Sequence, residues 1–196
     1  MLTAASKQSG LHTSIIRSGQ IAGSRTSGSW NDNEWLPSII RSAHAVGCLP
    51  DGGDDVAWLP VDTAASTVLD ISQAQSQGVF SLTHPQPASW HTVMKGAAER
   101  LGVALVSYEE WLQKLSDIEA TSSETELAET LRKVPALKLK SFYANSSVSS
   151  TKREHVEALG NPRLSTKRSC KVSKTLKECE QLSEDDMMKW MDYWGL

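Results

Sequence analysis

Residues 12–23 read His12-Thr-Ser-Ile-Ile-Arg17-Ser-Gly19-Gln-Ile-Ala-Gly23, and they indicate the fold class of this 196-residue chain. The first five residues are rich in β-branched side chains, and a loop with two glycines follows them. This pattern predicts a buried strand that opens into a loop. Glycine at both loop positions indicates that the backbone there approaches another group closely or adopts a positive φ.

A helix over residues 33–47 is predicted next, because apolar side chains recur there at helical spacing. These side chains are Leu36, Ile39, Ile40 and Ala43. Asn31 or Asn33 can cap the start of the helix, and Gly47 can close its end. The segment 49–53, Leu-Pro-Asp-Gly-Gly, is predicted to be a turn.

Strands and helices then alternate along the chain, which is typical of an α/β protein. The predicted strands are 56–61, 79–83 and 103–106, and the predicted helices are 63–74, 90–101 and 108–116. Asp62 is expected to cap the first of these helices. Its inward face should carry Ala64, Ala65, Val68 and Leu69. Ser89 and Ser107 are expected to cap the next two helices, and Ser183 a last one that carries Met187, Trp190 and Trp194.

The composition excludes several classes of protein. The chain is 39% hydrophobic and 22% charged, without an apolar run that could cross a membrane or a signal peptide at its start. Three scattered cysteines predict neither a disulfide framework nor a zinc site, and they fit the reducing cytosol. A net charge of −3 is no reason to expect nucleic acid as a partner. We therefore predict a cytoplasmic protein.

Two segments toward the C-terminus have distinctive compositions. Residues 145–152 are poor in apolar side chains and are predicted to be mobile. Residues 151–174 carry seven basic side chains against two acidic ones. Because no aromatic residues are interleaved with these charges, a solvated or disordered linker is favoured over a phosphate-binding surface.

A search for catalytic motifs finds no complete set. The spacing Gly19-x3-Gly23-x4-Gly28 is not a dinucleotide fingerprint, and neither a Walker A sequence nor a G-x-S-x-G elbow is present. His84 and His91 are separated by a proline and are not expected to bind a metal. Composition and spacing alone therefore predict an α/β domain without an identifiable active site.

Several short motifs in collinear order are together more specific. They are the stretches 16–23, Gly28-Ser-Trp30-Asn31, Glu34-Trp35-Leu36-Pro37, Trp58-Leu-Pro60, His84-Pro-Gln-Pro-Ala-Ser-Trp90, Tyr108-Glu-Glu-Trp111 and Trp190-Met-Asp-Tyr-Trp194. In this combination the chain resembles the C-terminal part of thioester reductase domains. These belong to the extended short-chain dehydrogenase/reductase superfamily and occur in fungal aminoadipate-reductase-like and nonribosomal-peptide-synthetase-like enzymes.

This resemblance implies an α/β fold made of the C-terminal portion of a Rossmann fold, with an incomplete parallel sheet, and a small substrate-binding lobe. The family reduces a carrier-bound acyl thioester with NADPH, using a Gly-rich cofactor loop and a Tyr-x-x-x-Lys pair. Neither motif is present here, and Met1 would fall inside the helix that follows the Lys. We therefore expect a truncated reductase that does not bind NADPH on its own. A non-catalytic binding module that docks a carrier protein or a partner reductase is the alternative.

The resemblance also implies roles for particular residues. The backbone of Gly19, Gln20 and Ile21 would pass beside the nicotinamide ring of the cofactor. Trp30, Asn31 and Trp35 would line the mouth near the thioester, although packing between lobe helices explains the tryptophans equally well. Arg17 could meet a charge on the cofactor or substrate, but a salt bridge at the end of its strand is favoured. No catalytic residue and no metal ligand are predicted.

The resemblance divides the chain into three parts. Residues 1–117 would hold the end of the Rossmann sheet and the substrate-binding lobe, 118–175 a polar, partly flexible extension, and 176–196 a helix that docks on the lobe. The expected partner is an acyl carrier domain with its phosphopantetheine arm. An N-terminal reductase half, or a second copy of the chain, could also pair with the bare edge of the sheet.

Overall fold

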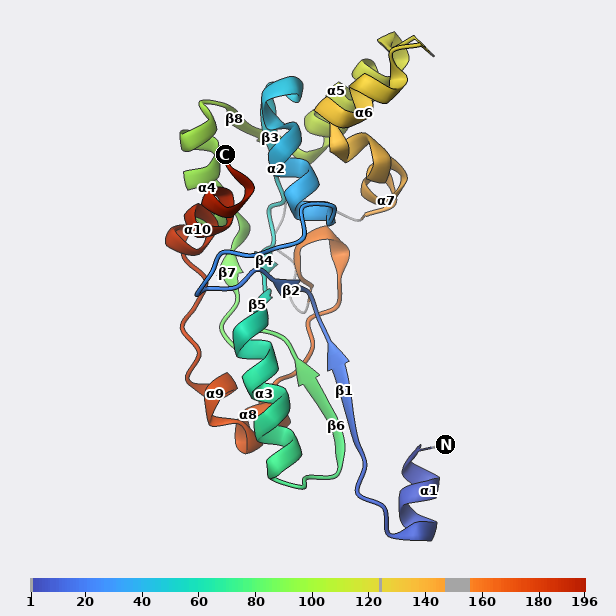
Figure 1. Cartoon of the computed structure of the whole chain (residues 1–196), viewed down its shortest axis with the longest axis vertical. Coiled ribbons are helices and arrows are strands. Elements are labelled where there is room, and N and C mark those ends of the chain that lie inside the picture. The colour runs from blue at the N-terminus through green and yellow to red at the C-terminus, as the bar shows by residue number, and fades with distance from the viewer. Residues whose placement is uncertain (1, 124, 147–155) are drawn as a thin grey trace.

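The computed structural model describes residues 2–123, 125–146 and 156–196 (Figure 1). The molecule is elongated, with a helical lobe at one end and a two-stranded parallel sheet at the other. The N-terminus lies at the far end of the sheet, and the C-terminus lies in the lobe. Among the described residues, no helix is both long and apolar enough to cross a bilayer.

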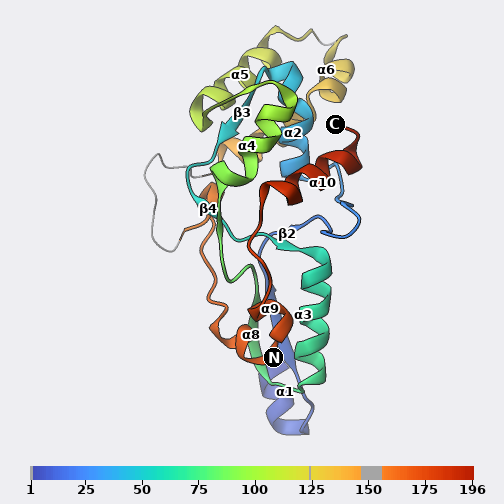
Figure 2. The same cartoon turned by 90° about the vertical axis from the view of Figure 1, so that its left-hand side faces the viewer.

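The sheet end is built on the predicted first and third strands. β1 (Ser14–Ser18) pairs in parallel with β6 (Gly78–Leu82), with Ile16 opposite Phe80. The elements around this pair are α1 (Leu2–Ser9), α3 (Val61–Gln73), α8 (Lys167–Val172) and α9 (Lys174–Lys177). α8 packs against β6, and α9 packs against α3 (Figure 2). This end of the molecule therefore has the predicted α/β class, with a parallel sheet of only two strands.

The core of this end is small. The buried apolar residues that form one cluster there are Leu59, Ala64, Leu82, Leu176 and Cys179, and Ile71 and Phe80 are buried nearby. α3 turns Ala64, Thr67 and Ile71 inward, so the prediction that Val68 and Leu69 face the core is wrong. Leu69 is 59% exposed, because α3 packs through its other face against α8 and α9.

The lobe surrounds a second pair of parallel strands, β3 (Cys48–Asp51) and β8 (Ala104–Ser107). Its principal helices are α2 (Trp35–Val46), α4 (Trp90–Leu101), α5 (Tyr108–Thr121) and α10 (Glu184–Trp194). β3 contradicts the turn predicted for residues 49–53. Pro50 is tolerated because a strand of a two-stranded sheet always has a free edge.

Two shorter strand pairs join the lobe to the sheet end. β2 (Ile21–Ala22) runs parallel to β5 (Leu59–Pro60), and β4 (Asp55–Val56) runs antiparallel to β7 (Ala88–Ser89). The single strand predicted over 56–61 is therefore split in two, and Val61 already begins α3.

The helix ends agree only in part with the predictions. Gly47 and Gly102 close α2 and α4 in the left-handed conformation, and the Ser107 hydroxyl accepts from Glu110 N–H at the start of α5. Ser183 forms a capping box with Asp186 at the start of α10. Neither Asn31 nor Asn33 caps α2, whose N-cap is Glu34. Asp62 likewise lies inside the first turn of α3 rather than at its N-cap.

The segment 118–175 contributes to the core where it is described. Its further elements are α6 (Leu127–Lys133), the 3-10 helix η1 (Pro135–Leu139), α7 (Lys140–Ala144) and the 3-10 turn η2 (Ala158–Gly160). Ala136 and Tyr143 are fully buried, and their elements pack against α2 and α5.

The linker predicted over 151–174 is wrong for its described part, since α8 lies within it and Arg168 stacks over the Phe80 ring at 5.2 Å. The predicted mobility of 145–152 falls mainly on residues outside the described part of the chain.

Candidate functional site

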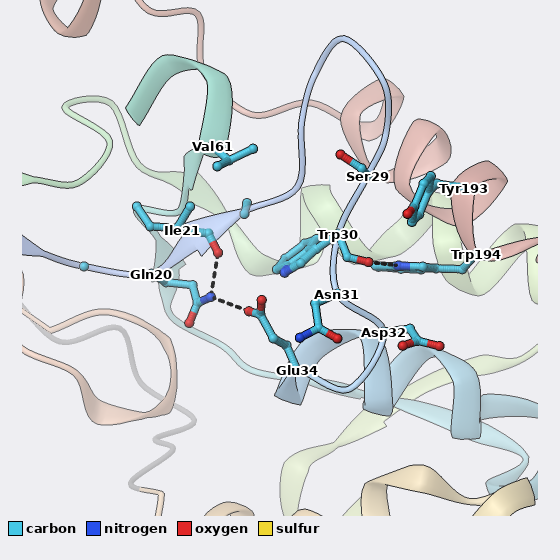
Figure 3. Close-up of a pocket in the computed structure, with 12 residues that line it drawn as sticks. Gln20, Ile21, Ser29, Trp30, Asn31, Asp32, Glu34, Val61, Tyr193 and Trp194 are labelled. Atoms are coloured by element: carbon cyan, nitrogen blue, oxygen red, sulfur yellow. Dashed lines mark hydrogen bonds between the residues drawn. The ribbon is translucent and has the colours of Figure 1, made fainter. Parts of the chain in front are cut away.

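A cavity of about 860 Å³ lies where the β1–β2 loop meets the lobe (Figure 3). Twelve residues line it, from the β1–β2 loop, the segment before α2, the start of α3 and the end of α10. They are Gly19, Gln20, Ile21, Ala22, Ser29, Trp30, Asn31, Asp32, Glu34, Val61, Tyr193 and Trp194. Its size is in the range of small-molecule sites in proteins.

The cavity brings together most of the residues predicted from the sequence. Gly19, Gln20 and Ile21, predicted beside the cofactor, share its wall with Trp30 and Asn31, predicted beside the substrate. Trp35 does not reach this cavity. It lines a neighbouring one of about 370 Å³, which Gly19 and Gln20 also line.

Gln20 separates the two cavities, and its side chain is held in place by three hydrogen bonds. Trp35 Nε1 donates to Gln20 Oε1 at 2.8 Å. Gln20 Nε2 donates to Ile21 O at 2.7 Å and, over a longer 3.4 Å, to Glu34 Oε2. Because its side-chain amide is already hydrogen-bonded within the protein, Gln20 can offer a ligand mainly its backbone.

Close packing explains the second glycine of the loop. A Cβ atom at Gly23 would lie 2.7 Å from Trp190 Cδ1 and 2.9 Å from Trp30 Cβ, so no side chain fits there. Gly23 has no positive φ, whereas Gly28 does, at +72°. The expected close approach of the backbone is thus confirmed at Gly23.

Asp62 anchors the loop 24–27 instead of capping α3. Its Oδ2 accepts from Ser24 Oγ at 3.2 Å, from Arg25 N at 3.0 Å and from Thr26 N at 3.2 Å. Partial burial raises the pKa of the Asp62 carboxyl, but the hydrogen bonds from Thr26 and its neighbours outweigh this effect. The pKa of Asp62 is therefore below its usual range, and the carboxylate is ionised at neutral pH.

Arg25 ties the same loop to the C-terminal helix. Its Nε and Nη2 donate to the two carboxylate oxygens of Asp186, both at 3.0 Å, which is the bidentate geometry of a strong ion pair. The Asp186 side chain is nearly buried. α10 is thereby held over the cavity, where it contributes Tyr193 and Trp194 to the wall.

The tryptophans form a continuous cluster behind the cavity. Ring centroids of Trp30 lie 4.8 Å from Trp190, 5.8 Å from Trp194 and 6.4 Å from Trp58. Trp30 is only 6% exposed and packs within the lobe, and it also lines the cavity. Trp90 and Trp111 are fully buried core residues.

Arg17 is exposed beside the smaller cavity. Within the described part of the chain it forms no ion pair, so the salt bridge expected at the end of its strand is wrong. Its guanidinium is left available at the rim of that cavity.

The tyrosines do not form a proton-donating pair with lysine. Burial raises the pKa of Tyr108 to about 12, and it also raises the pKa of Tyr143. Their hydroxyls donate to Tyr143 O at 3.1 Å and Trp35 O at 2.7 Å, so both have structural roles. Tyr193 lines the cavity, but none of the lining residues is a lysine. Among the described residues there is also no cluster of side chains able to hold a metal ion.

Glu34, Tyr193 and Trp194 were not predicted as site residues. Glu34 lies between Asn31 and Trp35, which were predicted as site residues. No other feature of the sequence indicated Glu34. Tyr193 and Trp194 are over 160 positions from the loop they face, and their Trp-rich helix indicates packing rather than a site.

Comparisons with known proteins show what the chain is similar to. Residues 1–68 match an NAD-binding family described as male sterility protein. The chain is 35% identical over 198 residues to adenylate-forming reductase Nps10 of Heterobasidion annosum, and 30% identical over 205 residues to a carboxylic acid reductase of Neurospora crassa. These matches cover 99% and 97% of this chain but only 18% of each relative.

Solved structures show the same fold. The terminal R domain from the myxalamid PKS-NRPS pathway superposes with a TM-score of 0.65 at 21% identity, over 98% of this chain and 45% of that one. A thiolation-reductase di-domain from an archaeal non-ribosomal peptide synthetase gives 0.64 at 18% identity, over 99% of this chain and 38% of that one. The chain is therefore a homologue of fungal adenylate-forming reductases, with the fold of part of a terminal reductase domain.

Proposed function

We propose that this chain forms the substrate-binding part of an NADPH-dependent thioester reductase and holds a carrier-bound acyl thioester in the cavity beside Trp30. The observation that carries the proposal is the shared cavity of Gly19, Gln20 and Ile21 with Trp30 and Asn31. A reductase must bring cofactor and acyl carbon together, and a single cavity with both sets of residues suits that requirement. The three free cysteines fit a cytosolic location.

The matching NAD-binding family implies a nicotinamide cofactor, and the cavity suits one end of it. The backbone of 19–21 lines the cavity together with apolar Ile21 and Val61, surroundings that suit an uncharged aromatic ring such as nicotinamide. No lining residue is cationic, so nothing in this cavity fits the cofactor's phosphates. NADPH supplies a hydride when bound, and these residues would orient its ring. The phosphate-binding loop and the Tyr–Lys pair must come from other residues.

The proposed partner is an acyl carrier domain. Support comes from the di-domain relative, in which a thiolation domain is joined to the reductase. A phosphopantetheine arm would bring its thioester to the mouth of the cavity at Asn31. We further propose that β1 and the exposed side of α3 pair with the cofactor-binding half of a reductase, because a parallel sheet is normally covered on both faces.

Binding measurements on the purified chain test this proposal. Tryptophan fluorescence should report saturable binding of an acyl-pantetheine thioester, since Trp30 and Trp194 line the cavity. NADPH alone should cause no quenching beyond the inner-filter effect, because no cationic residue lines the cavity to hold its phosphates, a restriction that does not apply to free nicotinamide. A mixture of thioester and NADPH should show no NADPH oxidation. Tyr193→Ala is expected to weaken thioester binding, whereas Tyr108→Phe, away from the cavity, serves as the control.

Results that differ from these expectations would lead to different conclusions. Turnover by the chain alone would refute the need for outside catalytic residues. Absence of thioester binding would refute the substrate role. Capture of a carrier protein without any effect of the acyl group would instead favour a non-catalytic docking module.

A further inference from the structure

The indole N–H of Trp30 has no hydrogen-bond partner, although the side chain is only 6% exposed. A buried N–H without an acceptor destabilises the folded protein, so such groups are rare and call for an explanation. The indole nitrogens of Trp35, Trp90, Trp190 and Trp194 all donate to oxygen atoms of the protein. Trp30 thus differs from these four neighbours, and among the described residues only Trp111 has an indole nitrogen that is likewise buried without a partner.

Trp30 lines the cavity, while its indole nitrogen is itself buried from solvent. Figure 3 shows the indole nitrogen of Trp30 on the side of the ring directed toward Gln20 and Glu34. Glu34 is half-buried, and within the described part of the chain its carboxylate accepts only the 3.4 Å hydrogen bond from Gln20 Nε2. Such a long bond is weak, so the Glu34 side chain can rotate and admit another oxygen next to Trp30.

The charge around this point is negative. Asp32 and Glu34 line the cavity, and none of the twelve described lining residues is Lys, Arg or His. The Asp32 charge is balanced by an ion pair with Arg41, whereas Glu34 forms no ion pair with any described residue. A phosphate or carboxylate would therefore be repelled, and a neutral ligand that both accepts and donates hydrogen bonds would be favoured.

We propose that Trp30 and Glu34 together recognise a carboxamide group. The Trp30 indole donates to the amide oxygen, and the Glu34 carboxylate accepts from the amide N–H. This inference rests on the proposed function, because two ligands of a thioester reductase carry that group: the nicotinamide ring of the cofactor and the pantetheine arm of the carrier. Both have a neutral amide, and the cavity's lack of cations selects for such a group.

The indole signals in a ¹H–¹⁵N correlation spectrum test the pair directly. The chain holds seven tryptophans, so seven indole signals are expected. Trp30→Phe assigns the relevant one, with contacts to the Trp190 ring as a second route if that variant does not fold. Trp111→Phe is the matched control, because Trp111 Nε1 is also buried without a partner but does not line the cavity.

Two pairs of small probes separate the sources of the amide. Pantetheine represents the carrier arm, and nicotinamide represents the cofactor ring. Nicotinate replaces the amide of nicotinamide by a carboxylate of similar shape, and inorganic phosphate serves as an anion without a ring. We expect the Trp30 signal to move downfield with pantetheine or nicotinamide, and not with nicotinate or phosphate.

The affinities should follow the same pattern. Loss of one net hydrogen bond in Trp30→Phe is expected to weaken amide binding by about threefold to tenfold. Glu34→Ala should weaken it to a similar extent and should remove the discrimination against nicotinate. Trp111→Phe should leave both the affinity and the Trp30 shift unchanged.

The outcomes distinguish this inference from the proposed function. If acyl-pantetheine binds but the Trp30 signal stays in place, the carboxamide pair is wrong and the substrate role stands. If only nicotinamide moves the Trp30 signal, the pair stands and the substrate role fails. If neither amide moves it, or Trp30→Phe binds as well as the parent chain, the inference is overturned.

Discussion

In the helical lobe the apolar faces of α2, α4, α5 and α10 meet one another, whereas at the sheet end those of β1, β6 and α3 stay partly open (Figure 1). Trp90, Trp111 and Trp190 are fully buried in the lobe. By contrast, Leu69 and Val79 at the sheet end are 59% and 44% exposed. A lobe of this kind can hold itself together, while a two-stranded parallel sheet normally needs further strands and helices.

From this contrast we expect the lobe to contribute more to the free energy of unfolding than the sheet end. Trp190→Ala should destabilise the fold most, by about 4 kcal/mol, because the side chain is fully buried between Trp30 and Gly23. Urea denaturation followed by circular dichroism measures this change. Tyr193→Ala, an exposed position on the same helix, should cost less than about 0.5 kcal/mol. Equal losses for the two variants would contradict the lobe as the main core.

A truncation in the smaller core should have a weaker effect. Leu176 is fully buried at the sheet end, but few apolar residues surround it, so Leu176→Ala is expected to cost about 2 kcal/mol. The neighbouring exposed Lys177→Ala is the control. If Leu176→Ala destabilises the protein as much as Trp190→Ala, the two cores would be equivalent and the comparison would fail.

His84 connects the sheet end to the segment that leads into α10. It is buried, and one ring nitrogen lies 2.8 Å from Glu180 O. Burial lowers the pKa of His84 below its ordinary value. Below about pH 6.5 the unfolded chain takes up a proton that the folded chain resists, so stability should fall as the pH falls.

His84→Gln should flatten that part of the stability profile, at a cost of about 1 kcal/mol at pH 8 from the altered hydrogen bonds. The measurement is the urea midpoint between pH 8 and pH 5. His44→Gln, at an exposed position on α2, should leave the slope as it is. A slope that survives in His84→Gln would assign it to another group.

The smallest effect on stability is expected on the open face. Leu69→Lys should change the free energy of unfolding by about 0.5 kcal/mol or less, since the side chain is already exposed. Its effect should appear in self-association instead, because removing apolar surface disfavours contact between copies. Sedimentation velocity at several concentrations, with Ser66→Lys as a charge-matched control, measures this difference. An unchanged association constant would show that this face is not used.

Sequence patterns predicted the long elements well, because these depend on local periodicity. α2, α4 and α5 follow from their apolar spacing and from Gly47, Gly102 and Ser107 at their ends. β3 was missed because Leu49-Pro50-Asp51 favours a turn locally, and only its pairing with β8, over 50 residues away, makes it a strand. The inward face of α3 was wrong because α8 and α9 select which side of the helix is buried.

The candidate site was predictable where it is local in sequence. The loop 19–21 and the segment 30–31 are near neighbours, and both were predicted from one cluster of motifs. The Arg25–Asp186 ion pair, which holds α10 over the cavity, joins two ordinary charged residues that no local pattern connects. Trp35 was predicted beside Trp30 and Asn31, but it lines the smaller cavity on the other side of Gln20.

Because α10 forms part of the cavity wall, ligand binding is thermodynamically linked to the local stability of α10. Tyr193 and Trp194 line the cavity only while two contacts of α10 are intact. These are the ion pair between Asp186 and Arg25 and the hydrogen bond that Trp194 Nε1 donates to Trp30 O. A transient opening of α10 would therefore expose its amides to hydrogen exchange and abolish the cavity in the same event. A ligand at one hundred times its dissociation constant should slow that exchange by roughly a hundredfold, about 2.7 kcal/mol.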